Sequence, residues 1–162
     1  MTDFPFWSFS TEFYGRPGVA PACLALQDRF GCDVNLMLFA LWAARCGAEF
    51  GTAEFSRLDA AVQPWRARLV EPVRALRRAL KIDSLGILPD LAEGCRKKLL
   101  EAELAGERAA QELLARTLPL REPDEGGIDR NLAKANIAAY LAWRGVESEL
   151  ARQLAGTILA GL

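Results

Sequence analysis

The chain contains no histidine among its 162 residues, and this absence removes several common kinds of catalytic site. Nucleophilic catalysis of the Ser–His or Cys–His type needs an imidazole base, so neither type is available. The Walker loop, the GxGxxG turn, the HExxH helix and the aspartate-rich DDxxD and DxxxD motifs of helical prenyl-transfer enzymes are also missing from the sequence. The sequence therefore identifies no reaction, and catalysis is not the favoured interpretation.

The cysteines are few and show no metal-binding pattern. Four are present, namely Cys23, Cys32, Cys46 and Cys95, and none of them forms a CxxC pair. Without histidine, a zinc site would need an all-cysteine or cysteine–carboxylate set assembled from distant positions. We therefore expect no metal and no cofactor, and we interpret the cysteines as free thiols that help to fill the core.

No apolar stretch reaches the roughly 20 residues that a membrane-spanning helix requires. The longest run is interrupted by Asp33, Asn35 and Arg45. The first ten residues carry Asp3 and no basic residue, which is not the pattern of a secretory signal peptide. The sequence predicts a protein that does not span a membrane and is located in the cytoplasm.

The longest nearly uninterrupted apolar run is Cys32–Gly47, with the sequence CDVNLMLFALWAARCG. Asp33 is a suitable N-cap residue and Gly47 a suitable C-cap residue for a helix at about 33–46. Because apolar side chains surround the helix axis, this helix is expected to be buried on most of its surface.

The segments on either side of this run are amphipathic at helical spacing, and none combines strand-like alternation with clustered β-branched residues. We therefore predict an all-α fold, a single-domain helical bundle over residues 1–162 with about seven helices around the buried central helix. Residues 118–128 are rich in proline, glycine and acidic side chains, and they are expected to form a mobile loop.

Charge is distributed unevenly along the chain. Residues 57–82 carry seven bases and two acids, whereas residues 83–129 carry six bases and eleven acids. The basic segment has a continuous apolar stripe that includes Trp65, and Pro72 within it predicts a kink or a fresh helix start. Its arginines either meet the acidic segment and water or form a contact surface for an acidic protein partner. The candidate contact residues are Trp65, Arg66, Arg74, Arg77, Arg78 and Lys81.

Other kinds of partner fit the composition less well. The isoelectric point of about 5.6 and the absence of a recognisable nucleic-acid-binding module argue against nucleic acid. Peripheral contact with a membrane is compatible with a basic amphipathic helix but is less favoured. A homo-oligomer is compatible with the sequence.

Two carboxamides stand inside apolar helical patterns, Asn35 in the central helix and Asn136 near the C-terminus. A buried carboxamide without a partner costs about 1–3 kcal/mol, so each should be hydrogen-bonded. We expect Asn35 to lie close to a polar group of the helix near residues 131–140, such as Asn136 or Lys134. In the functional version of this hypothesis, a small polar pocket is lined by Asp33, Asn35, Lys134 and Asn136.

One resemblance extends these observations. The stretch FWSFSTEFYGRPGVAPACLALQDRFGCDVNLMLFALWAA resembles a family of uncharacterised proteobacterial proteins of about 160 residues, a domain of unknown function. The similarity is clearest over residues 4–46 and continues through WRARLVEPVRALRRALK. The resemblance implies a bacterial cytosolic protein. It brings no catalytic residue or cofactor, and it does not rule out an enzyme.

Three functional hypotheses follow. The leading one is a non-enzymatic protein that binds another protein through the basic segment or the N-terminal aromatic residues, and an exposed apolar patch near Trp65 would favour it. The second is a helical binder of an apolar small molecule or lipid, which a cavity of several hundred Å³ beside residues 36–42 would favour. The third is an enzyme that uses carboxylates and Asn35.

Overall fold

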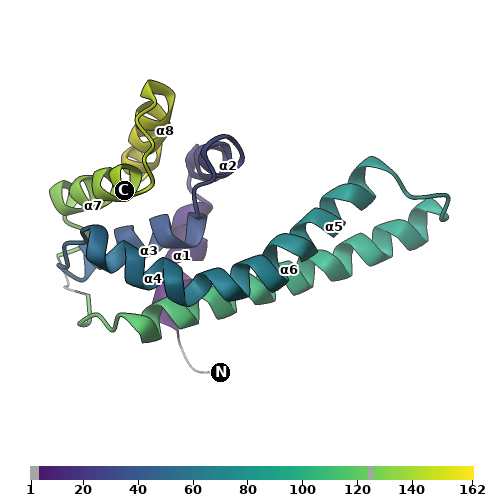
Figure 1. Cartoon of the computed structure of the whole chain (residues 1–162), viewed down its shortest axis with the longest axis horizontal. Helices are drawn as coiled ribbons and strands as arrows, with labels where there is room; N and C mark the ends of the chain where they lie inside the picture. Colours follow the sequence, from purple (N-terminus) through teal and green to yellow (C-terminus); the bar gives the residue numbers. More distant parts are fainter. Residues whose placement is uncertain (1–3, 124–125) are drawn as a thin grey trace.

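The computed structural model of the chain describes residues 4–123 and 126–162, and every regular element within them is a helix (Figure 1). The elements are α1 (Pro5–Tyr14), α2 (Val19–Phe30), α3 (Val34–Arg45), α4 (Thr52–Trp65), the π-helical stretch η1 (Arg66–Val70), α5 (Glu71–Ile82), α6 (Pro89–Thr117), α7 (Arg130–Trp143) and α8 (Glu149–Ala160). The predicted all-α helical bundle is confirmed.

The central helix predicted from the apolar run is α3, and it forms the core. Every residue from Asn35 to Ala44 is buried. The Asp33 side chain caps the helix by accepting a hydrogen bond from the Leu36 amide at 3.1 Å. Helices α1, α2, α4, α6 and α7 all pack against it. Helix α1 contributes aromatic side chains, since Phe6 packs on Phe39 with ring centroids 5.0 Å apart.

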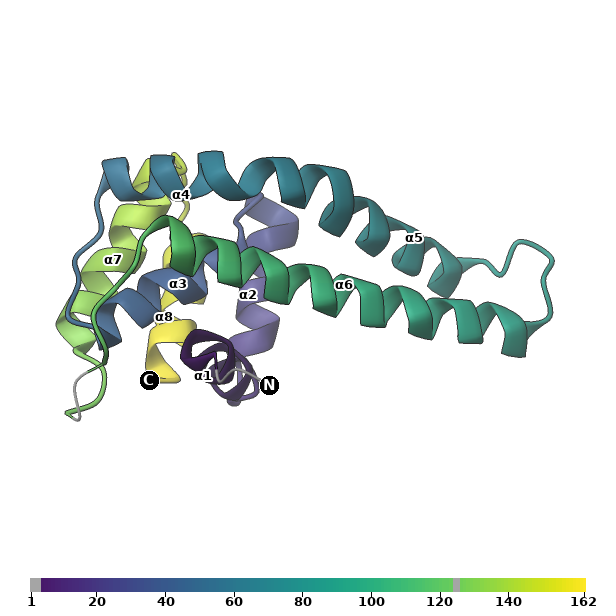
Figure 2. The same ribbon diagram turned by 90° about the horizontal axis from the view of Figure 1, so that it is seen from below.

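Helices α4, η1 and α5 follow one another as one long rod, and α6 runs back along it (Figure 2). The far part of α5 and the first turns of α6 project beyond the rest of the molecule as a two-helix hairpin (Figures 1 and 2). The expected discontinuity near Pro72 is a change of helix type, because η1 ends at Val70 and Pro72 lies in the first turn of α5. No side chain of α5 is buried.

The predicted loop at residues 118–128 lies between α6 and α7. Its described residues, 118–123 and 126–128, are not helical, and residues 124–125 of the predicted loop lie outside the described part of the chain. Arg121 donates a hydrogen bond to the Cys46 carbonyl, so the loop contacts the end of α3. The mobility of this loop stays a prediction.

None of the helices in the described residues is both long enough and apolar enough to cross a bilayer.

Candidate functional site

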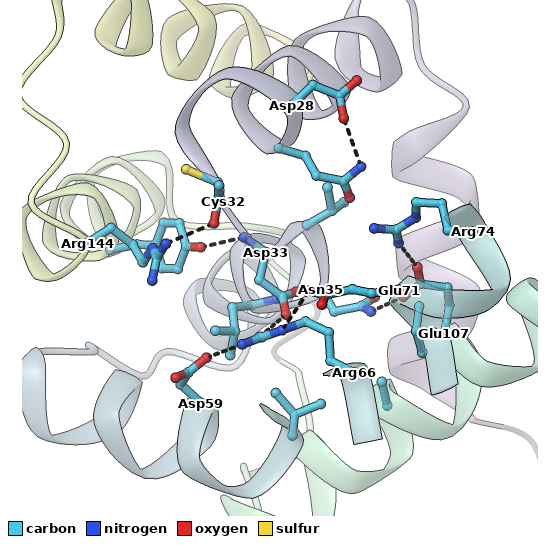
Figure 3. Close-up of a pocket in the computed structure, with 18 of the residues that line it drawn as sticks. Asp28, Cys32, Asp33, Asn35, Asp59, Arg66, Glu71, Arg74, Glu107 and Arg144 are labelled. Carbon is cyan, nitrogen blue, oxygen red and sulfur yellow. Dashed lines mark hydrogen bonds and ion pairs between the residues drawn. The ribbon is translucent and has the colours of Figure 1, made fainter. Parts of the chain in front are cut away.

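The N-terminal end of α3 opens into a cleft of about 370 Å³, which we call the polar cleft (Figure 3). Its walls come from the end of α2, the start of α3, the rod at α4, η1 and α5, the middle of α6 and the end of α7. Five acidic and four arginine side chains line it, so most of its polar surface is charged. They are Asp28, Asp33, Asp59, Glu71, Glu107, Arg66, Arg74, Arg78 and Arg144.

Arg66 of η1 holds three of these carboxylates together. Its guanidinium pairs with Asp33, lies 2.9 Å from Asp59 and lies 3.6 Å from Glu71. Burial lowers the pKa of Arg66, but the adjacent Asp33 and Asp59 outweigh burial and raise it above its ordinary value. Arg66 therefore stays charged and ties the start of α3 to the rod.

A second ionic cluster joins α5 to α6. Arg74 lies 2.9 Å from Glu103 and also pairs with Glu107, while Arg77 pairs with Glu103. Burial raises the pKa of Glu103, but hydrogen bonds from Arg77 and Arg74 outweigh burial and lower it. Glu107 is different, because its burial outweighs Arg74 and raises the pKa. The pKa of Glu103 is therefore lowered and the pKa of Glu107 is raised, although the two residues lie only one helical turn apart.

Asn35 connects α3 to this cluster. Its side-chain amide donates to Glu107, and its carbonyl oxygen accepts a hydrogen bond from Gln111 at 2.9 Å. The polar cleft meets a second cleft here, because Asn35, Glu107 and Arg74 line both.

The second cleft, which we call the apolar cleft, has a volume of about 320 Å³ and is lined by residues of α1, α2, α3, α5 and α6. Aliphatic and aromatic side chains form most of its wall. They are Trp7, Tyr14, Leu24, Val34, Leu38, Leu100 and Leu104. Two polar side chains of its lining, Ser10 and Gln111, are each only 2% exposed, and both have an oxygen without a hydrogen-bond partner.

The structure brings only part of the predicted polar pocket together. Asp33 and Asn35 line the polar cleft, whereas Lys134 is exposed on α7. Asn136 is buried and pairs with backbone groups, donating to Ala40 at 3.0 Å. It also donates to the Ala48 carbonyl and accepts from the Phe50 amide. The partners of Asn35 come from α6 instead of α7.

Helix α7 reaches the start of α3 through another side chain. The hydroxyl of Tyr140 accepts a hydrogen bond from the Asp33 amide at 2.7 Å. Its pKa is raised, chiefly by burial and by the nearby Asp33 carboxylate. Tyr140 is therefore a neutral hydrogen-bonding group in this position.

The candidate contact residues of the basic segment have different environments. Arg66, Arg74 and Arg77 are half-buried in the ionic clusters described above. Trp65 donates from its indole nitrogen to the Gly106 carbonyl at 2.9 Å, and Arg78 lies 3.2 Å from Asp28. Among the basic candidates, Lys81 is exposed and has no ion pair within the described residues.

Sequence reasoning missed Glu103, Glu107 and Gln111 as site residues. They follow one another at spacings of four, so they lie on one face of α6. This spacing is a usable signal, but alternating charges on a long helix are also typical of a solvated face.

Metal binding has no structural support within the described residues, since no group of three cysteine, aspartate or glutamate side chains is arranged to hold an ion. Cys23, Cys32 and Cys46 are buried free thiols, and Cys95 is exposed. Burial raises the pKa of Cys23 to about 12, so this thiol stays protonated and unreactive.

Comparison with known proteins identifies the family but not an activity. Residues 5–114 match a family described as protein of unknown function, DUF2390, so the chain belongs to that family. Among curated proteins and among solved structures, none matches the chain. Any function must therefore be argued from the geometry.

Proposed function

We propose that the chain is a non-enzymatic module that binds another protein through the tip of the α5–α6 hairpin. The observation that carries this proposal is the exposure of large apolar side chains at the tip. Ile82 is 87% exposed, Leu85 73% and Leu88 70%, and Ile87 and Leu91 beside them are also exposed. Contiguous apolar surface of this kind marks interaction sites in soluble proteins.

The conformation of the tip supports the same proposal. Leu85 has a φ of +55°, a left-handed conformation that costs a leucine roughly 1–2 kcal/mol. The Asp83 carboxylate holds the turn by accepting a hydrogen bond from the Leu85 amide at 2.9 Å. The Leu85 side chain is exposed, so this conformation does not bury it within the chain. Burial of the side chain against a partner would offset the cost of the left-handed backbone.

The charges of the hairpin bear on the chemistry of the partner. Asp83 and Asp90 are exposed at the tip, while Lys81, Lys97 and Lys98 are exposed on its two arms without an ion-pair partner within the part of the chain that the structure describes. We therefore propose a partner with an apolar groove for the tip and with acidic side chains that reach the lysines of the arms. The proposed contact lies at the hairpin tip and not along the whole basic segment, because Arg66, Arg74 and Arg77 already pair within the chain.

An enzymatic role is less well supported. Two carboxylates of the polar cleft, Asp33 and Glu107, are engaged by Arg66 and Arg74, and Asn35 is engaged on both its oxygen and its nitrogen. These groups satisfy one another, so the cleft is more easily understood as the junction that joins α3, η1 and α6.

The test is a comparison of a tip variant with a matched control. Leu85→Glu combined with Leu88→Glu adds two charges to the tip, whereas Leu150→Glu alters a partly exposed leucine on α8. Proteins captured by wild type from the native cell extract are identified by mass spectrometry. The recovered partner is then purified, and its Kd is measured by calorimetry for each variant.

We expect the tip variant to weaken binding by at least about tenfold and the α8 control to leave it unchanged. Affinity should also fall with added salt, because lysines contribute. Equal Kd values for the tip variant and wild type would contradict the proposal. Sedimentation of the pure protein gives a second check, since a dimer that is lost in the tip variant would assign the tip to self-association instead.

A further inference from the structure

We infer that the apolar cleft binds a neutral, mostly apolar small molecule that carries a hydroxyl or N–H donor. The cleft is lined by residues of α1, α2, α3, α5 and α6, and none of the exposed apolar residues of the hairpin tip at 82–91 belongs to its lining. The inference therefore does not depend on the proposed protein contact, and either can fail without the other.

The unpaired oxygens of Ser10 and Gln111 define the polar end of the ligand. A buried polar atom without a partner costs about 1–3 kcal/mol, and here two such atoms belong to residues that line the same cleft. The amide nitrogen of Gln111 is already used, because it donates to Asn35 at 2.9 Å. Its remaining oxygen is only an acceptor, so the ligand must supply a donor.

The charges around the cleft favour a neutral ligand. Arg74, Arg77 and Arg78 reach its lining, but all three are paired. Arg74 and Arg77 pair with Glu103, Arg74 also pairs with Glu107, and Arg78 pairs with Asp28. An added anion would compete with these glutamates, and an added cation would compete with these arginines. A neutral hydroxyl or N–H donor competes with neither cluster, and it supplies the hydrogen-bond donor that the two oxygens lack.

The volume sets the size of the apolar part. A dry apolar cavity of roughly 150 Å³ holds one benzene ring. The apolar cleft, at about 320 Å³, has about twice that volume and so accommodates a molecule with two fused rings or a chain of similar bulk. Trp7, Leu38 and Leu104 provide the matching apolar walls.

The experiment uses a pair of probes that differ by one hydroxyl group, 1-naphthol and naphthalene. Their binding to the full chain is measured by calorimetry. The wild type is compared with Ser10→Ala, which removes one unpaired oxygen without breaking any hydrogen bond of the described residues. Leu104→Trp places a bulkier side chain in the lining of the cleft, and Leu150→Trp makes the same exchange on α8, outside it.

We expect wild type to bind one 1-naphthol per chain, and to bind naphthalene roughly 3- to 10-fold more weakly, the ratio that one net hydrogen bond supplies. Ser10→Ala should weaken 1-naphthol by a similar factor and leave naphthalene unchanged. Leu104→Trp should weaken both probes, and Leu150→Trp neither.

Three results would overturn the inference. They are no binding of either probe to wild type, equal affinity for the two probes, and binding that Leu104→Trp does not change. Thermal unfolding followed by circular dichroism identifies any variant that fails to fold. In that case, 1-naphthol is added to the wild type, and the NMR chemical shifts of the backbone amides of Ser10 and Gln111 are followed. Changes at these amides place 1-naphthol in the apolar cleft, and their absence contradicts the inference.

Discussion

At the scale of single residues, Glu107 occupies the point where the polar and apolar clefts meet. Its carboxylate accepts from Asn35 and pairs with Arg74, yet burial raises its pKa above the ordinary value of 4.5. A raised pKa in the folded state means that folding favours the protonated form. The stability linked to this group is fully present below its unfolded pKa and is lost as the pH rises through the folded pKa.

Replacing Glu107 with glutamine should reveal this effect. Glutamine keeps an acceptor for Asn35 and Arg74 but cannot ionise, so the variant should gain stability relative to wild type as the pH rises above about 4.5. The measurement is urea unfolding at a series of pH values. Glu101→Gln, at an exposed position of the same helix, is the control and should follow wild type. A pH-independent difference between Glu107→Gln and wild type would contradict this assignment.

At the scale of elements, the close packing of α6 against the rod depends on a glycine in the middle of a long helix. A Cβ atom added at Gly106 would lie 2.8 Å from Leu69 and 3.2 Å from Val70. The indole of Trp65 also bonds to the Gly106 carbonyl. Contact between α6 and η1 thus requires a residue without a side chain, although glycine is a poor helix former.

Alanine substitutions separate packing from helix propensity. Gly94→Ala, in open space on the same helix, should stabilise the protein by about 0.5–1 kcal/mol because alanine favours the helix. Gly106→Ala should instead destabilise it by about 1–3 kcal/mol, since the methyl group would displace the side chains of Leu69 and Val70. Denaturant unfolding measures both. If both substitutions stabilise the protein, the close approach of α6 and η1 is not as tight as the structure shows.

At the scale of the whole molecule, a well-packed body carries a projecting hairpin that has little core of its own. All residues of α3 from Asn35 to Ala44 are buried, whereas α5 buries none. The hairpin is joined instead by ion pairs such as Arg74 with Glu103. Regions with few buried apolar contacts open locally at a lower free energy than the core does.

Hydrogen exchange should show this division. Amides of α3 are expected to exchange slowest, near the rate set by global unfolding. Those of residues 76–82 and 89–97 should exchange by local opening at a much lower free energy. Mass spectrometry of peptides after exchange distinguishes the two regions. Equal protection of the hairpin and α3 would mean that the hairpin unfolds together with the body.

Much of the fold could be predicted because its signals are local. The apolar run around Leu38 requires a buried helix, and Asp33 begins it as a cap in the structure as in the prediction. The candidate site was predicted only in part. Asp33 and Asn35 are recognisable as polar groups that need partners. The sequence predicts a partner of Asn35 in α7, whereas Glu107 and Gln111 of α6 fill that role.

The sequence by itself determined that the chain is helical, which helix is buried, and which side chains share a face, because spacing along a helix sets these properties. Only the tertiary structure decided which faces meet. Arg74 and Glu103 are far apart in the sequence, and their pairing depends on how α5 and α6 align across the hairpin. In this alignment α6 approaches the rod closely, since a Cβ atom added at Gly106 would lie 2.8 Å from Leu69. The two clefts exist only once that alignment is set.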